Sequence, residues 1–249
     1  MTSRDDERPP ATTGAAARAT TDATAHANQD AGYRQHRFTP APGSCELLLI
    51  RHGESQPAFP GQPFPITDGR SDPALAPEGV EQARRIADRL ASQRIDAVYV
   101  TSLRRTAQTA GPLARRLGLV PNVERQLREV GLGEWEGGTY RKRIAENGPL
   151  VRRMMAEERW DVIPGAEPAA EFAARVKNAI ERLAAAHPGQ RLAVVTHGGV
   201  IGQAMALATG GRPFAFIGAD NGSISQLVVR GSEWVVRGFN DTAHLNGSE

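Results

Sequence analysis

The chain contains Leu47-Leu-Leu-Ile-Arg-His-Gly-Glu54, in which four large aliphatic residues are followed at once by a cation, an imidazole and a glycine. Such an apolar run, flanked by turn residues, is typical of a strand buried on both faces of a parallel sheet. Ligands of these sheets bind at the carboxyl ends of the strands. A histidine there can attack phosphorus, and an adjacent arginine can hold phosphoryl oxygens. The segment alone is equally compatible with a strand that merely ends in polar residues.

A second apolar run, 192–196, is followed by His197. Because parallel strands end at the same edge of a sheet, we expect His52 and His197 to be neighbours. Arg51 adds a guanidinium from the first run, and Arg105 adds another from the start of the helix predicted after a strand at 95–100. Two guanidiniums and two imidazoles in one cleft indicate a site for a dianion, most simply a phosphoryl group.

Strand and helix patterns alternate along the chain, which predicts an α/β fold with a mostly parallel sheet and right-handed crossovers. Helical spacing of apolar residues and capping signals mark the helices, and β-rich runs mark the strands. The predicted strands are 47–50, 95–100, 123–127 and 192–196, with a closing hairpin of 223–230 and 234–239; the predicted helices are 77–91, 103–117, 141–160, 168–186 and one ending near 208.

Residues 1–44 differ from the rest, because they are rich in Ala, Thr, Pro, Gly and charge and offer almost nothing to bury. We expect this tail to be disordered and residues 45–249 to form one domain. The tail has no apolar segment of the kind a signal peptide needs. With no run long enough to span a membrane, we expect a cytoplasmic protein without a membrane partner.

The charge balance argues against a nucleic-acid partner. The pI is about 9.0, but the formal net charge is only +2, and the basic residues are interspersed with acids. Nucleic-acid binding needs a clustered basic face. The sole cysteine, Cys45, excludes an internal disulfide, and no Cys/His group has zinc spacing, so we expect neither a metal nor another cofactor.

Three further stretches are candidates for a part in the site. Residues 56–72 are dense in Pro and Gly, which excludes a helix or a central strand and suggests a substrate wall or a loop pinned by its aromatic rings. Gly131, Gly133 and Gly137 lack the spacing of a dinucleotide fingerprint, and we reject that interpretation. The rings of 214–216 suggest either a pocket for an organic group or simple packing.

From about residue 45 onward, the chain resembles the histidine phosphatase superfamily, which has the phosphoglycerate mutase-like fold. The resemblance rests on the order of seven motifs, whereas a single Arg-His-Gly would be a weak match. The matching segments are Arg51-His-Gly-Glu54, Asp72-Pro-Ala-Leu75 with Gly79-Val-Glu-Gln-Ala83, Ser102-Leu-Arg-Arg-Thr-Ala-Gln-Thr-Ala110, Leu127-Arg-Glu129, Gly133-Glu-Trp-Glu-Gly137, Val195-Thr-His-Gly-Gly199 and Asn221-Gly-Ser223.

The resemblance implies a three-layer α/β/α domain and a metal-independent phosphoryl transfer. His52 would be the nucleophile that becomes phosphorylated, and Glu129 would protonate the leaving oxygen. Glu134 and Glu136 are the competing acids. Arg51, Arg105 and His197 would clamp the phosphoryl oxygens, and the remaining substrate-binding residues would be Gly53, Ser55 and Gly198.

The chain also departs from the family pattern. An asparagine is common where Pro57-Ala-Phe59 stands, a tryptophan where Arg70 stands and a proline where Ser102 stands. Arg70 would be an additional anion contact or, more simply, a surface loop residue. These positions face substrate or lie in loops, so the chemistry is expected to be intact while the usual substrate does not follow.

Three functions remain. A phosphatase acting on a small phosphate ester is favoured, because the insertion after Glu129 is modest whereas family mutases typically carry longer ones. A phosphoglycerate mutase that depends on a bisphosphate primer is the alternative. A non-catalytic phosphate-binding module is disfavoured because His52 and Glu129 are both present. The sequence leaves the oligomeric state open, including a homodimer.

Overall fold

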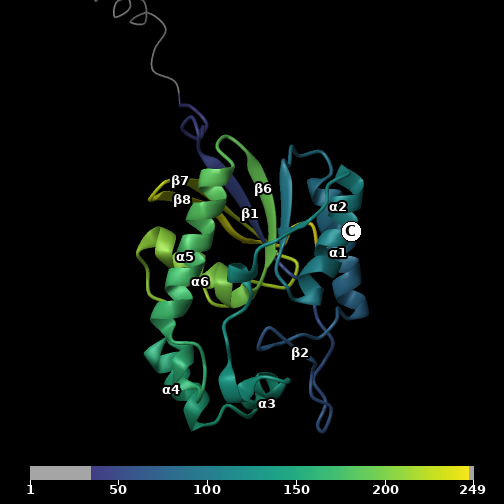
Figure 1. Ribbon diagram of the computed structural model, residues 1–249, viewed down its shortest axis with the longest axis vertical. Coiled ribbons are helices and arrows are strands. Elements are labelled where there is room, and N and C mark those ends of the chain that lie inside the picture. Colours follow the sequence, from purple (N-terminus) through teal and green to yellow (C-terminus); the bar gives the residue numbers. More distant parts are fainter. Residues whose placement is uncertain (1–34, 247–249) are drawn as a thin grey trace, which may run out of the picture. The chain divides into compact units, whose positions relative to one another are not determined.

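A computed structural model of the protein describes residues 35–246 (Figure 1). The predicted disorder of residues 1–44 falls mainly on residues 1–34, which lie outside the described residues, so it stays a prediction. Residues 35–39 contain no helix or strand. The elements described below all belong to the unit that begins at Pro40.

Six strands form the central sheet, namely β1 (Cys45–Arg51), β4 (Ala97–Val100), β5 (Asn122–Val123), β6 (Arg191–Thr196), β7 (Ile224–Arg230) and β8 (Glu233–Asp241). Their order is β5-β4-β6-β1-β7-β8. The pairs β5-β4, β4-β6 and β6-β1 are parallel, whereas β7 runs antiparallel to both β1 and β8. The mostly parallel sheet and its closing hairpin are therefore confirmed.

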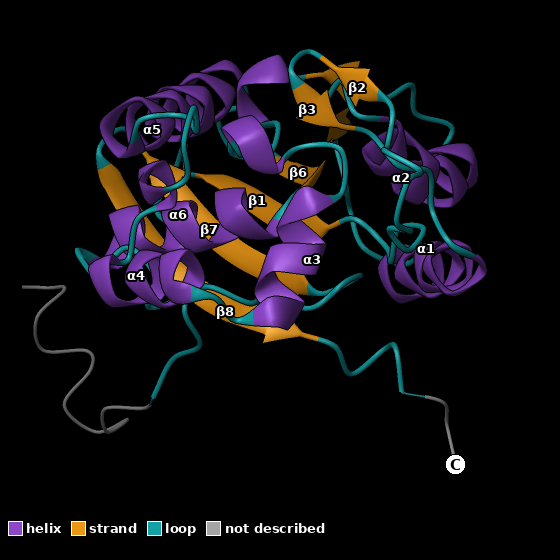
Figure 2. Ribbon diagram, turned by 90° about the horizontal axis from the view of Figure 1, so that it is seen from below, coloured by secondary structure: helices purple, strands orange, loops and turns teal. Residues whose placement is uncertain are grey.

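Helices cover both faces of the sheet, as Figures 1 and 2 show. They are α1 (Pro77–Leu90), α2 (Arg104–Leu117), α5 (Ala169–Ala186) and α6 (Gly198–Thr209). Because successive strand residues point to opposite faces, Leu47 and Leu49 pack with α5 and α6, whereas Leu48 and Ile50 pack with α1 and α2. The aliphatic run is thus buried on both faces, and the three-layer α/β/α architecture is confirmed.

A smaller set of elements lies at the end of the sheet toward which β1 runs (Figure 1). It comprises the hairpin strands β2 (Ile66–Thr67) and β3 (Arg70–Ser71), and the helices α3 (Thr139–Glu146) and α4 (Pro149–Glu157). The helices pack around a separate core that includes Trp135, Met154 and Ile163. These elements are well placed to surround ligands at the strand ends.

One predicted element was wrong in detail, and another is resolved into two parts. The mostly helical stretch predicted at 141–160 consists of the two helices α3 and α4, which are separated because Asn147 adopts a left-handed conformation (φ 47°) and Pro149 starts a new helix. The strand predicted at 123–127 pairs only through β5, and Arg125–Leu127 forms a 3-10 turn instead. Glu124 caps that turn by accepting the Gln126 N–H at 2.9 Å, which competes with sheet pairing.

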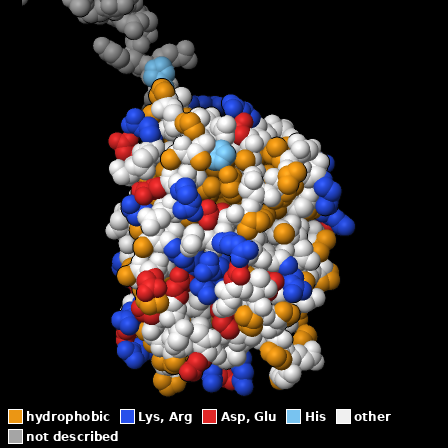
Figure 3. All heavy atoms as spheres, in the orientation of Figure 1, with side chains coloured by type: hydrophobic (Ala, Val, Ile, Leu, Met, Phe, Trp, Pro, Cys, Tyr) orange, Lys and Arg blue, Asp and Glu red, His pale blue; other side chains and the backbone are white. Residues whose placement is uncertain are grey.

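The surface drawn in Figure 3 shows Lys and Arg side chains interspersed with Asp and Glu. Ion pairs within one helix join Arg85 to Glu81 in α1 and Arg153 to Glu157 in α4. Within the part of the chain that the structure describes, no helix has the length and apolarity needed to cross a membrane.

Candidate active site

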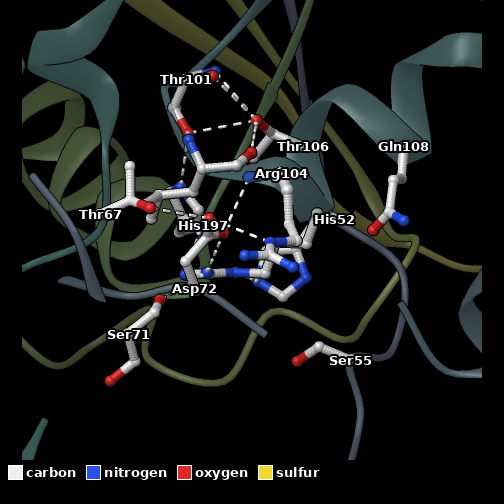
Figure 4. A network of polar contacts seen from close by, with 12 residues as sticks. His52, Ser55, Thr67, Ser71, Asp72, Thr101, Arg104, Thr106, Gln108 and His197 are labelled. Carbon is white, nitrogen blue, oxygen red and sulfur yellow. Dashed lines mark hydrogen bonds and ion pairs between the residues drawn. The ribbon is translucent and has the colours of Figure 1, made fainter. Parts of the chain in front are cut away.

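Strand register places the two predicted histidines side by side. Arg51 is the register partner of Thr196 in the parallel pair β1-β6, and the His52 backbone N–H donates to the Thr196 carbonyl at 3.0 Å. The residues that follow, His52 and His197, therefore leave the sheet together. Their ring centroids are 5.2 Å apart in an edge-on arrangement (Figure 4).

Arg105, in the first turn of α2, connects both rings. Its Nε donates to His52 Nε2 at 3.0 Å, and its Nη2 donates to His197 Nδ1 at 3.2 Å. Nη1 donates to the Ser71 carbonyl at 2.8 Å. Since arginine only donates, both of those ring nitrogens are acceptors. The other nitrogens then carry the protons, so that His52 Nδ1 donates to the Gly53 carbonyl at 2.7 Å and His197 Nε2 donates to Thr101 Oγ1 at 3.0 Å.

Both imidazoles are held neutral. Burial, followed by the charges of Arg105 and Arg51, holds the pKa of His52 well below 6.5. Burial and Arg105 do the same to the pKa of His197. Burial also lowers the pKa of Arg105 to about 10, although Glu129 and Asp72 oppose the shift, so this guanidinium remains cationic at neutral pH. The site thus combines neutral rings with fixed positive charge.

Arg51 supplies the second guanidinium. Its Nη1 donates to the carbonyl oxygen of Ala219. Gly198 packs against the guanidinium, because a Cβ built there would lie 3.3 Å from Nε. Burial lowers the pKa of Arg51, while the charge of Glu129 opposes that shift. Gly198 therefore allows α6 to begin directly against this cation.

Glu129 is the acid that reaches the same site. Its Oε2 accepts the Gly199 N–H at 3.3 Å, and its Oε1 accepts the Val130 N–H at 3.0 Å. A Cβ on Gly199 would lie 2.5 Å from Oε1, so only glycine allows the carboxylate to approach the start of α6. Glu136, a competing acid, instead accepts backbone N–H groups of Ser71 at 2.7 Å and Leu132 at 2.9 Å. Its contacts hold loops together.

A buried ion network supports Glu129 from behind. Arg70 Nε and Arg175 Nη2 each donate to the Glu129 carbonyl at 3.0 Å. Glu167 pairs with both cations at 2.5–3.0 Å, and the three side chains are only 10–14% exposed. Burial alone would raise the pKa of Glu167, but hydrogen bonds from Arg175 and from the Gly131 backbone N–H, with the charges of both arginines, lower it overall. The interpretation of Arg70 as a surface loop residue was therefore wrong.

The glycine of the Arg-His-Gly stretch is needed for a close approach. A Cβ on Gly53 would lie 2.4 Å from the Gly79 carbonyl oxygen, and one on Gly79 would lie 2.0 Å from that of Glu54. The backbones of the motifs at 51–54 and 79–83 thus pack directly against each other. The Gly53 N–H donates to Thr109 Oγ1 at 3.0 Å, which places Gly53 behind the site.

Four residues of the site were given no role when the sequence alone was considered. Thr101 binds His197, and the Asn221 side chain donates to the His52 carbonyl at 2.9 Å. Tyr140 and Arg141, from the start of α3, line the cavity in front of the site. The Asn221-Gly-Ser223 motif could have indicated Asn221, but no local signal pointed to the residues from α3.

These residues surround a cavity of about 520 Å³. Of the predicted site residues, six line it and two, Gly53 and His197, lie behind it. Phe214 and Phe216 do not line it, because they pack against Trp160 and Phe239 respectively. The six predicted site residues that line the cavity are Arg51, His52, Ser55, Arg105, Glu129 and Gly198.

Among the described residues, no group of three or more His, Cys, Asp or Glu side chains has the arrangement of a metal site.

Known proteins are similar to this chain in sequence and in fold. The chain is 33% identical over 208 residues to phosphoglycerate mutase-like protein 4 of Arabidopsis thaliana, covering 81% of this chain and 87% of that protein. It is 31% identical over 205 residues to a metal-independent phosphoserine phosphatase of the same plant, covering 81% and 83%. The structure of a mycobacterial glucosyl-3-phosphoglycerate phosphatase is 28% identical, has a TM-score of 0.66, and matches 80% of this chain and all of that one.

The sequence profile of the histidine phosphatase superfamily (branch 1) matches residues 47–242. This span runs from the first aliphatic residues of β1, through Arg105, Glu129 and His197, to the residue after β8. By the order of its motifs and by its fold, the chain belongs to the histidine phosphatase superfamily.

Proposed function

We propose that the protein hydrolyses phosphomonoesters through a phosphohistidine formed on His52 Nε2. One observation carries the proposal, namely the 2.7 Å hydrogen bond from His52 Nδ1 to the Gly53 carbonyl, which leaves Nε2 unprotonated. Burial and two guanidiniums keep the ring neutral, so Nε2 has a lone pair at neutral pH. An incoming phosphoryl group would take over the N–H of Arg105 that Nε2 now accepts.

In the first step, Nε2 attacks phosphorus, and the N–P bond forms as the P–O bond to the leaving group breaks. Arg51 and Arg105 bind the phosphoryl oxygens, where charge is spread in the transition state. Glu129 gives its proton to the departing oxygen. We propose that His197 orients Arg105 by accepting at Nδ1, and that Nδ1 donates to the same oxygens once the ring changes tautomer, because Thr101 Oγ1 is able to donate to Nε2 in that tautomer.

In the second step, water attacks phosphorus and the N–P bond breaks, which releases inorganic phosphate. The Glu129 carboxylate takes a proton from that water and is ready for the next turnover. Since guanidiniums supply the positive charge, we expect activity to persist in the presence of a chelator. This expectation matches the name of one relative, a metal-independent phosphoserine phosphatase.

The test is the His52→Ala variant, with His36→Ala as a control because His36 is exposed. We expect His52→Ala to lose turnover and to lose acid-labile labelling of the protein by a radioactive phosphoester in a rapid quench. The control should retain both. Turnover that is unchanged in His52→Ala would refute the mechanism.

A phosphoglycerate mutase would use the same phosphohistidine and remains the second candidate, because one relative is named phosphoglycerate mutase-like. The two activities differ in the fate of the phosphoryl group. A phosphatase releases phosphate steadily without a primer, whereas a mutase depends on bisphosphoglycerate and returns the group to substrate. Wild-type protein that binds phosphate but turns over no ester would indicate a binding module.

A further inference from the structure

The cavity extends well beyond the groups that would hold a phosphoryl group. At about 520 Å³ it falls in the range of pockets that enclose drug-sized ligands. Its inner end holds His52, Arg51 and Arg105. Its outer part is formed by the loop 56–73 and by the stretch from Val130 to Trp160. A small phosphorylated metabolite would leave most of this outer part unfilled.

The outer part is walled by aromatic rings that are braced against one another. Tyr140 lies between Trp135 and Trp160, with ring centroids 6.2 Å and 6.0 Å apart, and Trp160 rests on Phe214 at 4.9 Å. The rings of Trp135, Tyr140 and Trp160 line the cavity, together with Leu132. Rings held in this way present a preformed apolar surface to a leaving group and lose little conformational entropy when it binds.

Arg141 places a cation beside this apolar wall. Its Nη2 donates to Ser55 Oγ at 2.7 Å, its Nη1 donates to the Gln56 carbonyl at 2.6 Å, and its guanidinium lies 5.2 Å from the centroid of the Phe64 ring. Among residues 35–246 it has no carboxylate within ion-pair distance. Burial lowers the pKa of Arg141, and so does the charge of Arg51, while the charge of Glu54 opposes the shift. A partly desolvated cation whose hydrogen-bond partners are all neutral favours an incoming anion.

The carboxylates around the cavity make an ammonium-bearing ligand a poorer fit. Glu129 is needed at the reacting end. Glu136 is occupied by the Ser71 and Leu132 backbone N–H groups. Glu54 lines the cavity too, but its side chain belongs to a residue exposed to solvent. An amino group on the substrate would therefore lack a buried partner, whereas a second acid group would find Arg141.

We propose that the outer cavity is a leaving-group subsite for an apolar, ring-sized group that carries a second negative charge, and that Arg141 selects for that charge. This inference rests on the phosphohistidine mechanism proposed above, because it assigns the other end of the same cavity. It makes Arg141 a specificity-determining residue, acting on the organic part of the ester rather than on phosphorus.

The experiment compares phenyl phosphate, 3-carboxyphenyl phosphate and phosphoserine on the wild type and on Arg141→Gln. The control is Arg143→Gln, whose guanidinium lies on the same helix, is half exposed and pairs with Glu146. We expect the wild type to prefer 3-carboxyphenyl phosphate over phosphoserine. Arg141→Gln should lower kcat/KM for the carboxylated ester by about tenfold to a hundredfold, and by clearly less for phenyl phosphate.

The ratio of variant to wild type within each ester removes the intrinsic reactivity of the leaving group. Equal losses on both aryl esters, or a wild-type preference for phosphoserine, would overturn the subsite. Acid-labile labelling of His52 by each ester separates this outcome from failure of the mechanism. If labelling occurs without the preference, only the subsite is wrong; if His52→Ala still turns over, the mechanism is wrong.

Discussion

The inner and outer ends of the cavity are built in different ways. At the inner end, His52 and His197 directly follow two paired parallel strands, and Arg105 stands at the start of a helix. The outer end is made of the short β2-β3 hairpin, 3-10 turns, the first turn of α3 and glycines with positive φ, such as Gly137 (φ 69°) and Gly138 (φ 99°). Regular register fixes the groups proposed to act on phosphorus, whereas tertiary contacts between irregular segments shape the space for the rest of the ester.

The largest effect should come from a single methyl group at the inner end. In Gly199→Ala, the new Cβ would lie 2.5 Å from Glu129 Oε1 and displace the carboxylate. We expect kcat for alkyl phosphates to fall about a hundredfold, because a misplacement of about 1 Å has an effect of this size. Thermal stability should not fall, since alanine favours a helix over glycine by about 1 kcal/mol.

The matched control is Gly148→Ala at the start of α4, where a Cβ would meet nothing within 4 Å. Loss of stability in Gly199→Ala without loss of activity would contradict the role given to this glycine.

A smaller effect on activity, with a clear effect on stability, is expected from the ion network behind Glu129. Glu167→Gln would leave Arg70 and Arg175 without their carboxylate partner. Breaking a buried pair of this kind typically costs about 3 kcal/mol or more in the free energy of unfolding. Denaturant unfolding measures that loss, and we expect kcat for esters with poor leaving groups to drop about tenfold as Glu129 shifts.

Glu81→Gln is the comparison for this network, because Glu81 forms only exposed pairs along α1. It should change the free energy of unfolding by less than about 0.5 kcal/mol. Similar stability losses in the two variants would contradict the role of burial.

The acid side of the pH profile tests the inner end without a mutation. His52 and His197 have pKa values lowered by burial and by cations, whereas an unfolded histidine titrates near 6.5. The acid limb of kcat/KM should therefore lie below pH 6.5. The unfolded chain binds more protons below that pH than the folded chain, so the free energy of unfolding should decrease as pH falls through 6.5. An acid limb at the ordinary histidine pKa would refute the inference that both imidazole rings are neutral.

The smallest effects should separate two rings within one loop. Phe64 lines the cavity and lies under Arg141, whereas Phe59 is 58% exposed and is not among the lining residues. Phe64→Ser should raise KM for aryl phosphates by about threefold to tenfold, given the usual strength of a cation–ring contact. Phe59→Ser should change KM and stability little. Steady-state kinetics with phenyl phosphate compares them, and equal KM values would contradict the wall assignment.

The sequence was sufficient to place the two histidines of the inner end, because the information on their placement is local, whereas it assigned no role to Thr101 and Asn221, which bind them. The alternation of Leu47, Leu48, Leu49 and Ile50 between two helix layers follows from strand geometry, and the position of His52 follows from the strand end. The reason for Gly53 was not visible, since it depends on contact with Gly79 from another element.

The outer end could not be predicted for the same physical reason. In the sequence, Arg70 cannot be told from a surface loop residue, because its partner Glu167 lies nearly a hundred residues further along the chain. The sequence left open whether Phe214 and Phe216 line a pocket or simply pack, and in the structure each packs against another ring. Tyr140 and Arg141 sit on a polar helix whose pattern does not reveal which side faces the cavity. Such contacts are set by tertiary structure and leave no periodic signal.

Cys45 stands at the other end of the strand that leads to His52. It is the chain's sole cysteine and is fully buried, and burial raises the pKa of its thiol to about 12. A thiol reagent would therefore react with it only when β1 separates from the sheet, so the labelling rate reports that opening equilibrium. Inorganic phosphate bound near His52 should slow the labelling by mass action. The labelling rate of this one native side chain would thus measure how strongly ligand binding at the active site stabilises the central strand against opening.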